Sequence, residues 1–199
     1  MIGIVDFSAG NLASIQNCLQ RLGAKFFISS STEKLKTAKK IIFPGVGNAK
    51  STMEFLEKKD LKKFLQNIKV PVLGICLGMQ LFFDFSEESN NKCLEIFSGK
   101  VRKFSFSNKK IKIPHMGWNS VNFSEGCPIF KNIPQNFDFY FIHSFFCDPQ
   151  NTNEIFGTTK YGEKEFTSVV WKKNFFGVQF HPEKSGKIGE KIFQNFLDI

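Results

Sequence analysis

Short apolar runs alternate with helical patterns along the first 84 residues, and this alternation constrains the fold more than any other feature of the chain. A strand is recognised by a short apolar or alternating run, and a helix by apolar residues three and four positions apart. Strands that alternate with helices pack into a parallel sheet with helices on both of its faces. The sequence therefore predicts an α/β fold. The strand-length runs are residues 1–6, 25–29, 40–43 and 70–75.

The stretches between these runs carry helix signals. Asn11 is placed to cap a first helix, and Gly23 is placed to end it. Ser30 and Glu33 have the spacing of a capping box for a short second helix. We expect two further helices, one over much of residues 50–68 and one from Leu77 to Asp84.

From about residue 94 the pattern changes to strands separated by short polar turns. Such strands often pair antiparallel, so we expect a smaller antiparallel sheet beside the mostly parallel one. The chain closes on an amphipathic helix with Ser185 as its expected cap. No repeat or linker interrupts the 199 residues, which favours a single domain over 1–199. The expected strands are residues 94–106, 112–123, 139–142, 155–159, 166–171 and 175–180.

A cysteine stands between two glycines where an apolar strand meets a helical run. The sequence there is Gly74-Ile75-Cys76-Leu77-Gly78. Flanking glycines permit the sharp turn that exposes a nucleophile, and the N-terminus of a following helix favours a thiolate. The backbone N–H of Leu77 is a natural donor to an oxyanion. A buried structural cysteine would be the ordinary explanation of this short motif alone.

A histidine and a carboxylate, His181 and Glu183, follow about a hundred residues later. Alternate residues of a strand share a face, so we expect the two side chains to point the same way. A thiol, an imidazole and a carboxylate form a nucleophilic triad, with the imidazole as base and acid and the carboxylate as its orienting group. A surface turn would explain His181-Pro182-Glu183 alone, but the combination with Cys76 favours an enzyme.

A second loop, Pro44-Gly45-Val46-Gly47, follows another strand of the predicted sheet. Ligands of such sheets bind beyond the carboxyl ends of the strands. The glycines allow a backbone N–H to be aimed into the site or away from it. A plain turn would carry the same residues, so this loop decides nothing alone.

Composition narrows the classes of partner. The net charge of +9 raises the question of nucleic acid or a membrane surface. The lysines are scattered and no nucleic-acid-binding motif accompanies them, so we expect neither partner. No apolar stretch approaches the roughly 20 residues of a membrane span, and no signal sequence is evident. The five cysteines lack metal-ligand spacing, so we expect free thiols in the cytoplasm and no metal or cofactor.

The motif from Gly74 to Gln80, together with His181-Pro182-Glu183, resembles the class I (triad) glutamine amidotransferases. Within that family the chain is most similar to the glutaminase subunits of imidazole glycerol phosphate synthases. The further segments that carry this resemblance are spread in order over nearly the whole chain: residues 6–23, 44–47, 114–119, 143–144 and 181–185.

The resemblance implies a reaction. Cys76 attacks the side-chain amide of glutamine, His181 delivers a proton to the leaving ammonia, and water then frees glutamate. Ammonia passes into a separate cyclase subunit with a (βα)8 barrel fold, so the partners implied are glutamine and this cyclase, in a heterodimer of the histidine pathway. The other residues implied are Gly45, Val46 and Gly47 in the oxyanion strand, Gln80, His143 and Ser144 around glutamine, and Asn11, Trp118 and Lys184 at the partner interface.

Three alternatives remain open at this point. Residues 7–10 and 89–95 depart from the family pattern, and paralogous subunits supply ammonia to amidotransferases that modify sugars for surface polysaccharide. Another cysteine hydrolase would need Cys76 and His181 but not Gln80 or Ser144. A non-catalytic binding module would not need an intact triad.

Overall fold

A computed structural model describes residues 1–7, 12–45 and 47–199. Five parallel strands form the centre of its sheet, in the order β2-β1-β3-β4-β13. These strands are β1 (Ile2–Val5), β2 (Phe26–Ser29), β3 (Lys40–Phe43), β4 (Val72–Ile75) and β13 (Phe175–Val178). Strands buried on both faces read as continuous apolar runs, as β1, β4 and β13 do.

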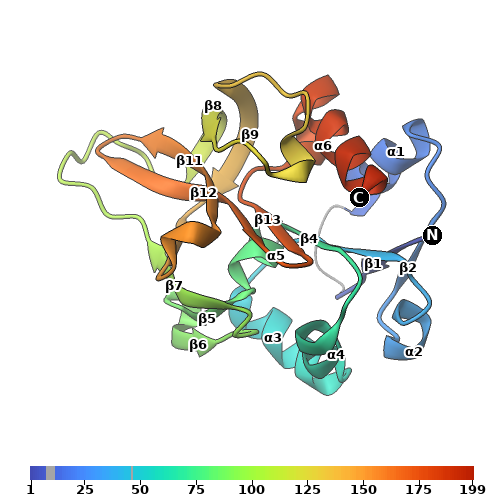
Figure 1. Cartoon of the computed structure of the whole chain (residues 1–199). Coiled ribbons are helices and arrows are strands. Elements are labelled where there is room, and N and C mark those ends of the chain that lie inside the picture. Colours follow the sequence, from blue (N-terminus) through green and yellow to red (C-terminus); the bar gives the residue numbers. More distant parts are fainter. Residues whose placement is uncertain (8–11, 46) are drawn as a thin grey trace.

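Helices cover both faces of this parallel region (Figure 1). Two of them pack on one face and three on the other, and a separate apolar cluster fills each interface. Neighbouring residues of β4 divide between the clusters, with Leu73 facing one and Val72 the other. The helices are α1 (Leu12–Arg21) and α6 (Gly186–Asp198) on the first face, and α2 (Thr32–Leu35), α3 (Ala49–Lys58) and α4 (Leu61–Asn67) on the second, with the single turn α5 (Leu77–Gln80) after β4.

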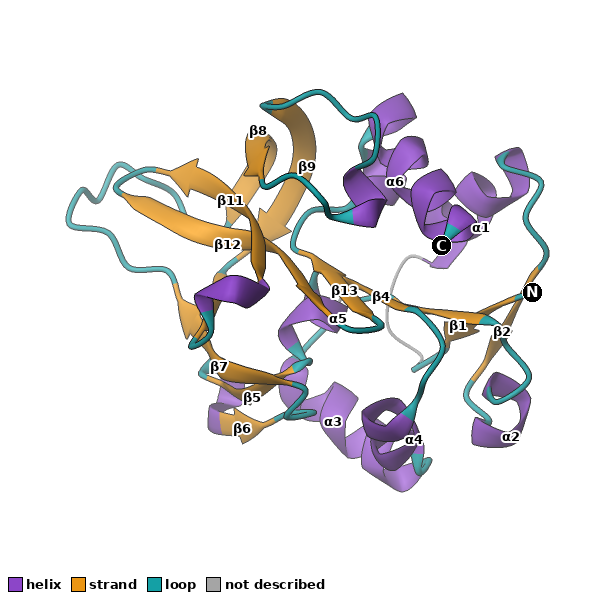
Figure 2. Cartoon of the chain, in the orientation of Figure 1, coloured by secondary structure: helices purple, strands orange, loops and turns teal. Residues whose placement is uncertain are grey.

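The sheet continues beyond β13 into mostly antiparallel strands, and Figure 2 shows them as a wing beside the helical layers. From β13 the order runs β12-β10-β7-β5-β6, while β11 pairs with β12 and leads to β8 and β9. The bounds are β5 (Phe83–Ser86), β6 (Asn91–Lys92), β7 (Phe97–Lys103), β8 (His115–Phe123), β9 (Phe137–His143), β10 (Phe145–Pro149), β11 (Ile155–Tyr161) and β12 (Lys164–Lys172). Short 3-10 turns complete the chain: η1 (Glu88–Asn90), η2 (Pro128–Phe130), η3 (Thr152–Glu154) and η4 (Pro182–Lys184).

The predicted α/β class is confirmed, but several predicted elements need correction. The helix expected over 50–68 is broken at Asp60, whose φ of 56° is left-handed, a conformation that Asp tolerates better than most residues. The helix expected from Leu77 to Asp84 ends at Gln80, because the chain then turns into β5 and pairs with β7. Ser31, not Ser30, caps α2 by accepting a hydrogen bond from the Lys34 N–H.

Other boundaries differ by a few residues, and β5, β6 and β10 were not predicted. The expected strand 94–106 is shorter, at 97–103, and the expected strand 139–142 is longer, at 137–143. Gly23 does follow the first helix, with a positive φ of 65°. The proposed cap at Asn11 lies outside the described residues.

Candidate active site

Cys76 occupies a strained turn between β4 and α5. Its φ is 52°, a left-handed value that is costly for a residue with a side chain and that is often found at functional sites. The loop after β3 packs directly on this turn: a Cβ on Gly78 would lie 2.1 Å from the Phe43 carbonyl oxygen. Only glycine fits such an approach. The glycines of the motif therefore serve the backbone geometry that presents the sulfur.

His181 reaches the sulfur because β13 lies beside β4. The two strands are parallel, with Val178 opposite Ile75, and the Cys76 N–H donates to the Val178 carbonyl. Past the end of β13, the His181 N–H donates to the Tyr140 carbonyl at 2.8 Å. Ser185 holds the same segment, since its Oγ donates to the His181 carbonyl at 2.7 Å and accepts from the Tyr140 N–H at 3.0 Å.

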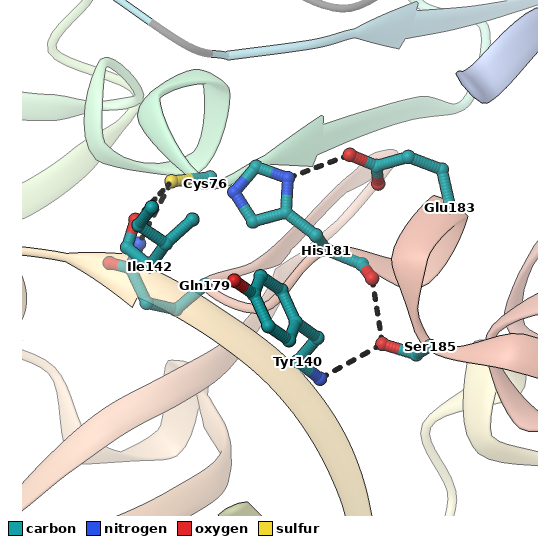
Figure 3. Close-up of polar contacts among 7 residues, drawn as sticks. All are labelled: Cys76, Tyr140, Ile142, Gln179, His181, Glu183 and Ser185. Carbon is teal, nitrogen blue, oxygen red and sulfur yellow. Dashed lines mark hydrogen bonds and ion pairs between the residues drawn. The ribbon is translucent and has the colours of Figure 1, made fainter. Parts of the chain in front are cut away.

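Ser185 therefore has a different role from the predicted one. It stands at the N-cap position of α6, but its side chain makes no cap hydrogen bond. Its hydroxyl instead ties the His181 segment to β9 (Figure 3).

The imidazole of His181 lies between the sulfur of Cys76 and the carboxylate of Glu183 (Figure 3). Its Nδ1 is 2.7 Å from Glu183 Oε1, and both side chains are almost fully buried. Its Nε2 faces the sulfur and has no hydrogen-bond partner among the described residues. The expected strand alternation is wrong as the reason for this pairing, because Glu183 lies in η4 and the chain has already left the strand.

The charges of this trio reinforce one another. Burial alone would lower the pKa of His181, but the Cys76 sulfur and the Glu183 carboxylate outweigh it and raise the pKa to about 10. An imidazolium is thus stable between a thiolate and a carboxylate. Such a pair can hold a proton next to the nucleophile and release it during a reaction.

A cavity of about 310 Å³ opens over the sulfur. Its size suits a small polar molecule rather than a polymer. It brings together most of the residues that sequence reasoning placed around the substrate, and adds others. The lining consists of Gly45, Gly47, Cys76, Leu77, Gln80, Glu88, Pro114, Ile142, His143, Ser144, Phe145 and His181. Val46 lies outside the described residues.

The Leu77 N–H, an expected oxyanion donor, is directed elsewhere in this structure. It points at the Gly45 carbonyl oxygen over 3.4 Å, which is long for a hydrogen bond. A Cβ on Gly45 would lie 2.2 Å from the Gly78 nitrogen, so this loop and the turn at Cys76 are in tight contact. In this arrangement a carbonyl, not an anion, faces the Leu77 donor.

Gln80 contributes its amide to the frame of the cavity. Its Nε2 donates both to the Phe145 carbonyl at 2.9 Å and to Gln179 Oε1 at 3.0 Å. Both amide protons are therefore used within the protein. Only Oε1 of Gln80 remains to meet a ligand, which is less than the role implied by the resemblance.

A pair of buried histidines supports the same wall. His143 Nδ1 is 2.7 Å from the Phe145 carbonyl, and its Nε2 is 2.9 Å from His115 Nδ1. Asn119 Nδ2 approaches His115 Nε2 at 3.2 Å. The carbonyl must accept, so each ring carries its proton on Nδ1, and the chain of bonds is complete with both rings neutral. Burial lowers the pKa of His143 to about 3 and that of His115 to about 4.

Sequence reasoning missed two residues of the site. Glu88 lines the cavity from η1, where its Oε2 accepts from the Ala49 N–H at 2.7 Å. Gln179 is fully buried, and its Nε2 donates to the Cys76 sulfur at 3.5 Å. Gln179 stands two positions before His181, so the spacing used for Glu183 was the available signal for it.

Two of the predicted partner residues, Trp118 and Lys184, lie exposed on the surface, the first on β8 and the second at the end of η4. Trp118 is 57% exposed on β8, and its ring lies 6.0 Å from that of Tyr140 on β9. Lys184 is exposed, with Nζ 5.8 Å from the Tyr140 ring centre. These two predicted residues therefore flank one tyrosine, close to the His181 segment.

Comparison with known proteins assigns the family. A family model described as "Glutamine amidotransferase class-I" matches residues 3–199. The chain belongs to this family. The proteins named "Imidazole glycerol phosphate synthase subunit HisH" from Methanocaldococcus jannaschii and from Dehalococcoides mccartyi are 49% and 43% identical to it. Those alignments cover 100% of this chain and 100% and 97% of the two relatives.

Solved structures support the fold. The crystal structure of a glutamine amidotransferase matches with a TM-score of 0.75 at 15% identity, over 99% of this chain and 97% of the other. The family resemblance of the motifs is confirmed by the family model and by the relatives.

Among the described residues, no group of three or more His, Cys, Asp or Glu side chains is arranged to hold a metal ion. No helix in the described part of the chain is long and apolar enough to cross a membrane. All five cysteines are buried free thiols.

Proposed function

We propose that this amidotransferase is the glutaminase subunit of an imidazole glycerol phosphate synthase and that Cys76, His181 and Glu183 are its catalytic triad. The observation that carries the triad is the buried imidazole held between sulfur and carboxylate. The observation that carries the subunit assignment is the full-length similarity to relatives of that name. The reaction is hydrolysis of glutamine to glutamate and ammonia.

The chemistry follows from the protonation of the trio. The Cys76 thiolate attacks the amide carbon of glutamine, and the carbonyl oxygen becomes an oxyanion. His181 gives its Nε2 proton to the amide nitrogen, which leaves as ammonia and leaves a thioester on the sulfur. His181 then takes a proton from water, the hydroxide attacks the thioester, and the thiolate departs from glutamate. Glu183 accepts a hydrogen bond from Nδ1–H and stabilises the imidazolium each time it forms.

The cavity supplies binding groups of the right charge. Glu88 can receive the α-ammonium of glutamine, because it is the carboxylate among the lining residues. The backbone at His143 and Ser144 and the free Oε1 of Gln80 can hold the remaining polar atoms. Gly45, Val46 and Gly47 would form the oxyanion strand together with the Leu77 N–H. Since that N–H faces the Gly45 carbonyl here, we expect the isolated chain to be a poor glutaminase.

The proposed partner is a cyclase subunit with a (βα)8 barrel fold, bound in a heterodimer. Its docking surface would be the exposed side of β8 and β9, where Met116 and Trp118 present apolar side chains and Lys184 lies beside Tyr140. Contiguous exposed apolar residues rimmed by charge are typical of interaction sites. Asn11 is proposed for the same interface and lies outside the described residues. Ammonia would pass across this surface without entering water.

The deciding experiment measures glutamate release by the purified chain alone, with a candidate cyclase from the same genome, and with that cyclase plus its nucleotide ligand. We expect strong stimulation only in the third mixture. Cys76→Ser should abolish glutamine use and leave synthesis from added ammonium intact. Glutaminase activity that ignores the cyclase would move the partner search to sugar amidotransferases, and no glutaminase activity at all would refute the reaction.

A further inference from the structure

Gln179 is a fully buried amide placed against the nucleophile. It lies one position past the end of β13, and its backbone N–H donates to the Ser168 carbonyl at 2.9 Å. Its side chain contacts the site at both ends: Nε2 is 3.5 Å from the Cys76 sulfur (Figure 3), and Oε1 is 3.0 Å from Gln80 Nε2. A buried amide with both ends engaged is held in one place.

The direction of this amide is decided by its neighbour. Gln80 Nε2 donates one proton to the Phe145 carbonyl, which can only accept. The group of Gln80 that faces Gln179 is therefore an N–H donor, so Gln179 must accept this hydrogen bond with Oε1. Turning the Gln179 amide over would set two NH₂ groups against each other. The NH₂ group of Gln179 consequently faces the sulfur.

A donor in that position distinguishes the two forms of the cysteine. A thiolate accepts a charge-assisted hydrogen bond, whereas a thiol is a weak acceptor. The Gln179 amide is fully buried, so water does not take its place as the donor to the sulfur when the amide is removed. We propose that Gln179 is a dedicated donor that stabilises the Cys76 thiolate and aims its sulfur into the cavity, and that Gln80 fixes Gln179 in the donating direction. This inference deepens the proposed function and rests on it.

Two groups then face the sulfur. Gln179 Nε2 donates to it at 3.5 Å, and His181 Nε2, which has no hydrogen-bond partner in the described part of the chain, faces it with Glu183 on the other side of the ring (Figure 3). His181 must leave its proton with the ammonia, whereas Gln179 cannot give up a proton at all. Gln179 thus remains a donor to the sulfur both when the thiolate attacks glutamine and when the thiolate departs from glutamate, because it takes no part in the proton transfers.

Alkylation of Cys76 by iodoacetamide tests this without glutamine or a partner. The rate follows the thiolate fraction and is read at the Cys76 peptide by mass spectrometry over a range of pH. Gln179→Met keeps the length of the side chain and removes the donor. We expect its alkylation to be about tenfold slower at pH 7 than wild type, with a midpoint about one pH unit higher. At a pH well above the midpoint the two rates should converge.

Controls separate the donor from a structural role. Asn195 is a buried amide whose Nδ2 donates to the Ile129 and Lys131 carbonyls and not to the sulfur. Asn195→Leu should lower the melting temperature without moving the alkylation midpoint. Gln80→Met, which frees the Gln179 amide to turn, should move the midpoint in the same direction as Gln179→Met by a smaller amount. It also provides a result if Gln179→Met does not fold.

The other titratable groups near the sulfur are common to all these variants. They are His181 with Glu183 behind it, His143 and Glu88 in the cavity wall, and Cys147 on β10. An unchanged midpoint in both Gln179→Met and Gln80→Met would overturn the inference, whether or not the rate falls uniformly. A moved midpoint in an enzyme that fails to hydrolyse glutamine would uphold the inference and refute the proposed function instead.

Discussion

The buried His115–His143 pair makes the folded state sensitive to acid in a defined way. Both rings are neutral in the folded protein, since burial lowers the pKa of His143 to about 3 and that of His115 to about 4. In the unfolded chain each would titrate near its ordinary value of about 6.5. The unfolded state therefore binds more protons below that pH. The contribution of the pair to stability is complete above about pH 6.5 and is lost as the pH falls towards the folded values.

The size of the effect follows from proton linkage. Between pH 6.5 and pH 5 each histidine is protonated in the unfolded chain and neutral in the folded one, which costs about 1.4 kcal/mol per pH unit. The loss is thus about 2 kcal/mol for each ring and about 4 kcal/mol for the pair. His181 behaves in the opposite sense: its raised pKa of about 10 gives stability that is present below pH 6.5 and lost as the pH rises towards 10. It does not affect the acid range.

The test compares wild type with His115→Asn, in which an amide N–H replaces Nδ1–H as the donor to His143. Urea unfolding at pH 7 and pH 5 gives the free energy of unfolding of each protein. The variant is expected to be less stable at both pH values, because it leaves space beside Phe141 and Tyr161. Its loss between the two pH values, however, should be about 2 kcal/mol smaller than that of wild type. Equal losses in the two proteins would refute the assignment of neutral rings.

Two further predictions concern the segment that carries the triad. Gly189→Ala should lower the free energy of unfolding by about 1–3 kcal/mol and reduce glutaminase activity, because the new Cβ would lie 1.9 Å from the Pro182 carbonyl and displace η4. Gly23→Ala, with open space around its Cβ, is the matched control and should cost stability through its φ of 65° without reducing activity. Glu183→Gln should lower the pKa of His181 in an NMR titration and reduce kcat about 100-fold with little change in KM, and an unchanged titration would contradict the role given to this carboxylate.

Local pattern was sufficient for much of the fold. The parallel strands before residue 80 and the helices between them carry clear signals, as does the apolar face of α6 with Ile192, Phe193 and Phe196. The predictions failed for segments that become strands only by pairing with a strand elsewhere in the chain. Leu81, Phe82 and Phe83 form a run without a period, and only pairing with β7 turns its end into a strand. The strand β10 likewise depends on β7, which lies more than forty residues earlier.

The site divides in the same way. Cys76, His181 and Glu183 stand out because a reactive residue type occurs at a glycine turn or beside a proline. Gln179 and Glu88 have ordinary residue types, and only their surroundings give them a role: one amide faces a sulfur, and one carboxylate lines a polar cavity. Contacts between side chains that are distant in sequence cannot be inferred from hydrophobic periodicity or from short motifs.

The shortness of α5 changes the physical account of the nucleophile. The sequence suggested a helix long enough for its N-terminus to favour a thiolate, but α5 is a single turn of four residues. Aligned peptide dipoles add up along a helix, so one turn contributes little. The stabilisation must come from side chains instead, and the parallel register of β4 and β13 provides them. Ile75 lies opposite Val178, so the next residue of each strand places Cys76 beside Gln179. A slip of β13 by one residue against β4 would turn the side chains of β13 to the other face and take Gln179 away from the sulfur.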